Sequence, residues 1–188
     1  ISQSGPLTAT MTGSAFTTNV NNKSITLTDG GNALAGNVAF TTQGATADVT
    51  WNNGATVTSL AGSTINGNLS VTTAQSIGQS GAVTVTGTTS LTTTGANHSV
   101  TLGSANTLTG AVTLSIASGN ATLTNGLTAI TLATSDIGGN LSLTSGAAIG
   151  QTGALTVSGT GSFTTTGANH SVTLDNGGNA VGGTITLS

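Results

Sequence analysis

Short aliphatic residues alternate with threonine or serine along most of this chain, and this period of two predicts many short β-strands. In each run one side carries leucine, isoleucine or valine and the other carries a hydroxyl, which is typical of a half-buried strand. Clear examples are residues 7–9, 25–27, 83–85, 112–114, 130–132, 141–143, 172–174 and 185–187. Connectors rich in glycine and asparagine separate the runs and favour tight turns.

The strand pattern repeats over a long period. Residues 77–102 (IGQSGAVTVTGTTSLTTTGANHSVTL) return as residues 149–174 (IGQTGALTVSGTGSFTTTGANHSVTL), an offset of 72 residues, and a more diverged copy begins at Ile1. The offset between the first two copies falls from 76 at Ile1 to 72 at Trp51. A one-residue slip inside a strand would turn its apolar side outward, so the connectors must absorb these differences.

The repeat predicts an all-β, parallel β-helix. We divide the chain into a partial unit (1–66), a complete unit (67–138) and a partial unit (139–188), and we expect it to be an excerpt of a longer array. Each unit splits into three similar lines of about 22–29 residues, a length that suits one turn of a β-solenoid. Coils stacked at about 4.8 Å would build a rod roughly 40 Å long. A β-sandwich of antiparallel hairpins is the competing fold, and the long repeat favours the solenoid.

The composition argues against several classes of partner. Only 3% of residues are charged, Lys23 is the single basic residue, and the net charge is −3. This cannot form the basic surface that nucleic acid or an anionic membrane requires, and no apolar run is long enough to span a bilayer. The absence of cysteine excludes disulfides, thiolate catalysis and thiolate-bound zinc.

The residues that could carry chemistry are replaced between copies. His98 and His170 occupy the same place in two GANHS segments, where the first copy has Lys23 instead. We therefore interpret the histidines as exposed corner residues about three coils apart. Asp29 and Asp175 lie in similar turns, but the middle copy has glycine and serine there. A polysaccharide-cleaving β-helix needs acidic and basic side chains that converge in a groove, and this chain has no arginine and only one lysine. We predict no enzymatic activity, no cofactor and no metal site.

Two recurring sets of residues are predicted to be structural. Three asparagines precede strands at equivalent places, where their amides could satisfy backbone groups at a bend and stack on one another in successive turns. They are Asn32, Asn106 and Asn179. The aromatic residues exchange with leucine between copies and are therefore expected in the core. They are Phe16, Phe40, Trp51 and Phe163.

Threonine runs such as 92–94 and 164–166 allow an alternative function. Outward threonine rows on a flat face could order water and bind ice, provided that the rows align on one face; the varying connector lengths argue against such alignment. A carbohydrate-binding or phage-tail-like β-helix is a second alternative and would need a groove lined by carboxylates.

The segment 139–174, followed by the line LDNGGNAVGGTITL, resembles the repeats of very large bacterial surface exoproteins. These are the filamentous-haemagglutinin-like adhesins of two-partner secretion and the related autotransporter passengers. The resemblance implies a right-handed parallel β-helical stalk that is secreted to the cell surface and works by rigid extension and self-association. It also implies that the partners are flanking repeats, a second copy joined head-to-tail or laterally, or a host or cell-surface glycan or protein. Both ends are then expected to present open strand edges.

Overall fold

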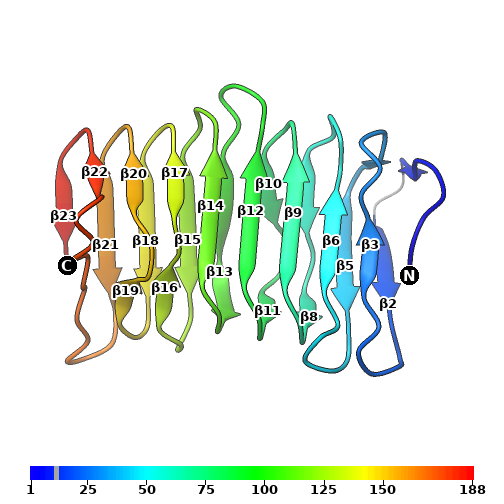
Figure 1. Cartoon of the computed structure of the whole chain (residues 1–188), viewed down its shortest axis with the longest axis horizontal. Helices are drawn as coiled ribbons and strands as arrows, with labels where there is room; N and C mark the ends of the chain where they lie inside the picture. The colour runs from blue at the N-terminus through cyan, green and yellow to red at the C-terminus, as the bar shows by residue number, and fades with distance from the viewer. Residues whose placement is uncertain (11–12) are drawn as a thin grey trace.

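The computed structural model describes residues 1–10 and 13–188, and every regular element among them is a β-strand. The chain winds as a rod of about nine coils from the N-terminus at one end to the C-terminus at the other (Figure 1). Each strand pairs in parallel with strands of the neighbouring coils. The predicted all-β parallel solenoid is confirmed. Within the described ranges, no helix could cross a membrane.

Two sheets form the two faces of the rod and lie one behind the other in Figure 1. The first sheet contains β2 (Gly13–Thr17), β5 (Asn37–Thr41), β7 (Thr58–Leu60), β8 (Ser63–Ile65), β10 (Ile77–Gln79), β11 (Val83–Val85), β13 (Val100–Leu108), β15 (Ala121–Asn125), β18 (Leu141–Ser145), β21 (Gly161–Thr165) and β23 (Ile185–Leu187). The second sheet contains β3 (Ile25–Leu27), β6 (Val49–Asn52), β9 (Leu69–Thr73), β12 (Thr89–Thr93), β14 (Val112–Ile116), β16 (Ile130–Leu132), β17 (Ser135–Ile137), β19 (Ile149–Gln151), β20 (Leu155–Val157) and β22 (Ala180–Val181). A short pair, β1 (Thr8–Ala9) and β4 (Ala33–Leu34), completes the first coils.

The coils overlap the expected length of 22–29 residues only in part, because many of them are shorter. Paired residues in adjacent coils are separated by as few as 19 positions, as for Thr58 and Ile77, and by as many as 25, as for Thr8 and Ala33. The expectation assumed three coils in each repeat unit. The 72-residue unit contains three and a half.

The half coil follows from the strand registers. Starting at Leu69, the second sheet passes through Thr89, Val112 and Leu132, which is three coils. Leu141, the equivalent of Leu69, lies half a coil further on, in β18 of the first sheet. Equivalent residues of successive units therefore lie on opposite faces of the rod.

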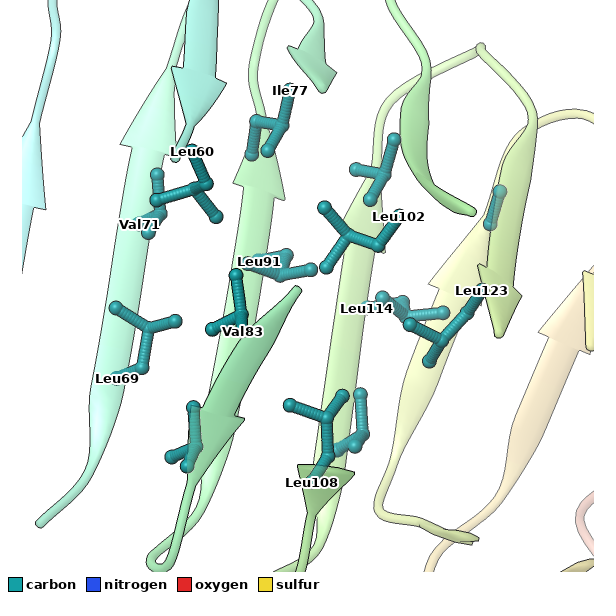
Figure 2. Close-up of a cluster of buried hydrophobic side chains, with 14 of the residues drawn as sticks. Leu60, Leu69, Val71, Ile77, Val83, Leu91, Leu102, Leu108, Leu114 and Leu123 are labelled. Carbon is teal, nitrogen blue, oxygen red and sulfur yellow. The ribbon is translucent and has the colours of Figure 1, made fainter. Parts of the chain in front are cut away.

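The core lies between the two sheets and follows the alternation in the sequence. Figure 2 shows leucine, valine and isoleucine side chains of both sheets meeting there, among them Leu91, Leu102 and Leu123. One inner row of the second sheet joins Leu27, Trp51, Val71, Leu91 and Leu114 in register. Because each coil contributes similar side chains, the core is continuous along the rod.

The aromatic residues lie at the N-terminal half of this core and near its C-terminal end. Phe40, Trp51 and Phe163 are buried, whereas Phe16 is partly buried and packs against the core. The rings of Phe16 and Phe40 are stacked, with their centroids 5.7 Å apart. The ring of Phe40 also packs against that of Trp51 in the opposite sheet, with a centroid distance of 5.3 Å. Leu123 is the equivalent of Trp51 and fills the core in the next unit.

Candidate functional site

The histidines do not form a common site. His98 lies in the corner that leads from the second sheet to the first, and His170 lies in the opposite corner. They lie three and a half coils apart and not about three, because the unit contains a half coil that turns equivalent residues to opposite edges. His170 is exposed as predicted, whereas His98 is half-buried. The Nδ1 atom of His98 lies 3.4 Å from the Ser76 hydroxyl. Among the described residues, no three His, Asp or Glu side chains gather as metal ligands do.

The aspartates lie in separate local settings. Asp29 accepts the N–H of Gly31 at 2.8 Å through Oδ1, and Asn176 accepts the N–H of Gly178 at 2.9 Å in the same way. Asp29 is thus the equivalent of Asn176. The sequence context had suggested that Asp175 is its equivalent. A carboxylate and an amide are interchangeable here because either oxygen can accept the bond of the turn.

Three glutamine–asparagine pairs tie neighbouring coils together. In each pair the glutamine Nε2 donates to the asparagine Oδ1, and the asparagine Nδ2 donates back to the glutamine Oε1. The pairs are Gln3–Asn32 (2.8 and 3.0 Å), Gln79–Asn106 (2.9 and 3.1 Å) and Gln151–Asn179 (2.8 and 2.8 Å). We call these the amide brackets. The three asparagines do not stack on one another as expected, because they lie three and a half coils apart on alternate faces.

The bracket at Asn106 shows how fully these amides are used. Asn106 is 0% exposed, and its Oδ1 also accepts the N–H of Val83 at 2.8 Å. Its Nδ2 lies within hydrogen-bonding distance of the carbonyls of Leu102 at 3.2 Å and Thr124 at 3.0 Å. One side chain thus joins three successive coils. Buried amides satisfied to this degree have a structural role, and none of their atoms is left to hold a ligand.

A second pair of asparagines, Asn53 and Asn125, is also buried, although the sequence predicted only tight turns at these positions. Asn53 and Asn125 accept the N–H of Leu34 at 2.9 Å and of Leu108 at 2.8 Å through Oδ1. Each returns a bond from Nδ2 to the carbonyl of the same residue, at 3.1 and 3.3 Å. Their offset of 72 residues was the available signal, but an Asn-Gly step indicates a turn and does not indicate burial.

Polar ladders run along the two edges of the rod. On one edge each residue accepts the backbone N–H of the next coil: Asp48 N to Ser24 Oγ at 3.1 Å, Asn68 N to Asp48 Oδ1 at 2.7 Å, and Thr88 N to Asn68 Oδ1 at 2.8 Å. The opposite edge repeats this with Ser99, Asn120, Asn140 and Thr160, at 3.0, 2.8 and 2.8 Å. These ladders satisfy backbone groups where the chain changes sheet.

Nearby corners contain three asparagines with a left-handed backbone. Asn22, Asn97 and Asn169 each have a φ of 61°, and they lie directly before Lys23, His98 and His170. Asparagine tolerates this conformation better than other residues with a side chain. The repeated element at these places is therefore the asparagine turn, whereas the following residue changes between lysine and histidine.

The outward hydroxyls of the two faces do align. On the second sheet, strands β6, β9, β12 and β14 form two parallel rows, which we call array one: Thr50, Ser70, Ser90 and Thr113 in one row, and Asn52, Thr72, Thr92 and Ser115 in the other. The first sheet has the equivalent array two: Thr122, Ser142, Ser162 and Thr186, beside Thr124, Thr144, Thr164 and Ser188. The connector lengths do not disturb the rows, because the extra residues lie in the corners.

The geometry defines the class: this is a β-solenoid repeat protein whose internal polar groups hold one coil on the next. A family model described as Repeats of unknown function (DUF5649) matches residues 46–115 and 118–188, which is more than half of the chain. The chain belongs to this family. The two matches begin 72 positions apart, in agreement with the unit seen in the structure. No curated protein and no solved structure matches the chain.

Proposed function

We propose that this chain is a structural segment of a secreted bacterial surface protein, a stalk or fibre of the adhesin type, that works by holding distance. The observation that carries the proposal is the use of its buried polar groups. The amide brackets, the buried asparagines and the edge ladders all join one coil to the next. Because these side chains bond one coil to the next, they stiffen the rod along its axis.

The chemistry of the two ends supports axial extension. At the C-terminal end Ile185 and Leu187 are 52% and 59% exposed, although they continue the core. At the N-terminal end a groove of about 480 Å³ is lined by Leu7, Phe16 and Leu27. Apolar strand edges of this kind pair readily with a further strand. We propose that a further coil covers each end, either from flanking repeats or from a second copy stacked head-to-tail.

The bracket nearest the C-terminal end supports the same reading. The Nδ2 atoms of Asn32 and Asn106 donate to a carbonyl of the following coil, that of Asn52 at 2.9 Å and that of Thr124 at 3.0 Å. Among the described residues, Asn179 donates only to its glutamine and to Leu174. Because a side-chain amide has two N–H groups, a following coil would supply a closer acceptor for the second one than the Leu174 carbonyl, which lies at 3.4 Å.

A tandem series tests the stalk. Variants with residues 117–188 repeated once and twice are measured by small-angle scattering and electron microscopy. Each added unit should lengthen the rod by roughly 17 Å, since three and a half coils stack at about 4.8 Å, and leave its width unchanged. A particle that grows in width would contradict the proposal. Surface location is tested separately with antibodies against the chain: intact bacteria that express the native protein should be labelled as strongly as permeabilised ones.

A further inference from the structure

We infer that arrays one and two are lateral docking faces for a second copy of this chain. This inference rests on the proposed structural role and names the partner and the surfaces. It follows from the half coil in the repeat, which places array one on one face of the rod and its equivalent, array two, on the other. Each molecule thus has two similar faces.

The hydroxyl side chains of the arrays are available for contact, whereas the Asn52 amide of array one accepts the N–H of Gly54 at 2.9 Å. Within residues 1–10 and 13–188, none of the hydroxyls of array one has a hydrogen-bond partner in the protein, and in array two only the pair Thr164 and Ser188 is joined, at 2.9 Å. The residues are half-buried or exposed, because neighbours in a row partly cover one another. Short hydroxyl side chains can interdigitate across two facing sheets about 10 Å apart and exchange hydrogen bonds.

Charge favours an identical partner over a charged one. The arrays contain no ionisable side chain; the row of the second sheet that ends array one at Ser115 continues to Asp136, in β17, and then to Thr156. The whole chain has one lysine, no arginine and a net charge of −3. Two copies can therefore approach face to face without burying an unpaired charge at the arrays and with little repulsion.

The size of the faces sets the strength of the contact. Each array covers four neighbouring strands, so it measures roughly 19 Å along the rod and roughly 16 Å along the strands. Two copies in contact would bury about 600 Å² in total at the arrays, which lies below the range of specific interfaces. One segment should thus associate weakly, and a longer array should associate strongly because its contacts are linked. With two like faces the assembly does not close at a dimer but continues into a layer of rods.

Four variants test this inference by sedimentation velocity over a range of protein concentrations. All are made in an end-blocked background, Ile185→Lys with Leu187→Lys, so that head-to-tail stacking cannot produce the signal. Ser70→Lys with Ser90→Lys charges array one, and Ser142→Lys with Ser162→Lys charges array two at the equivalent positions. The third variant combines both pairs. The control, Ala96→Lys with Ala168→Lys, adds the same charge at exposed corners.

The expected pattern is specific to two faces. The end-blocked protein and its corner control should form species larger than dimers, each single-face variant should stop at dimers, and the two-face variant should be monomeric. An end-blocked protein that stays monomeric at every concentration, or face variants that associate like the control, would overturn the inference. Thermal hysteresis of ice by the monomer, lost in the face variants, would also overturn it and assign the arrays to ordered water. None of these outcomes depends on the rod length measured above.

Discussion

Thr89 is a buried hydroxyl residue in a row of aliphatic side chains, and its replacement by valine should stabilise the protein. It is 1% exposed and lies in register between Leu69 and Val112 on the inner side of the second sheet. Within the described residues 1–10 and 13–188, its Oγ1 has no hydrogen-bond partner. Valine has nearly the same shape, so Thr89→Val leaves no cavity and removes only the unsatisfied group.

The expected gain follows from the burial of that hydroxyl. An unpaired hydroxyl in an apolar site costs about 1–3 kcal/mol, and valine also suits a strand better than most residues. We expect Thr89→Val to raise the free energy of unfolding by about 1–2 kcal/mol.

Thr73 provides the matched control, because it is equally buried but fully bonded. Its Oγ1 lies 2.9 Å from the Thr56 carbonyl and accepts the N–H of Gln75 at 3.0 Å. Thr73→Val removes these bonds and leaves buried groups unpaired, so it should lower stability by about 1–3 kcal/mol. The same substitution is thus expected to have opposite signs at two positions of neighbouring coils.

Urea unfolding measures both variants. The transition is followed by far-UV circular dichroism and by the fluorescence of Trp51, the only tryptophan, which is 1% exposed. Agreement between the two probes checks that the coils unfold together, as a comparison of midpoints requires. If Thr89→Val is no more stable than the parent, or if both variants shift in the same direction, the reasoning about the unpaired hydroxyl is refuted.

Two further predictions concern the contacts between coils, and both are measured by the same unfolding assay. Asn106→Ala removes the amide that joins three coils and should lower the free energy of unfolding by about 3 kcal/mol or more. Ser115→Ala on the outer face should leave it nearly unchanged. Equal effects of the two substitutions would contradict the role of the bracket. Gly119→Ala should destabilise the rod, because its Cβ would collide with the His98 carbonyl. A Cβ at Gly150 would meet open space, so Gly150→Ala should raise the free energy of unfolding by about 0.5–1 kcal/mol. A stable Gly119→Ala variant would show that the coils can move apart at this corner.

The strands, the core and the stacking could be predicted from the sequence, because they depend on local alternation and on the repeat. The row through Trp51 and Leu91 faces inward as the period of two requires. The number of coils in a unit could not be predicted in this way. Both sheets show the same alternation, so Leu69 and Leu141 look alike in sequence although they lie on opposite faces.

The amide brackets were predictable only in part. The asparagines stood out because they recur before strands, but their glutamine partners lie 27 to 29 residues away. Alternation does not indicate which polar residue meets which across a coil. Gln79 and Gln151 recur 72 positions apart, and Asn106 and Asn179 recur 73 positions apart; these nearly equal offsets were the signal that could have linked them. The alignment of the hydroxyl rows was likewise hidden, because the sequence does not show that the extra residues lie outside the strands.

The half coil has a consequence for any array built from this unit. With a whole number of coils, each outward feature would recur on one face only, and the opposite face would differ from it. With three and a half, one stretch of sequence supplies both faces in turn. The face of a residue changes only when about half a coil is added or removed, whereas the offsets between copies here range only from 72 to 76 residues. Small insertions therefore reshape the corners without moving an array to the wrong face, since the parallel register is restored in the next strand.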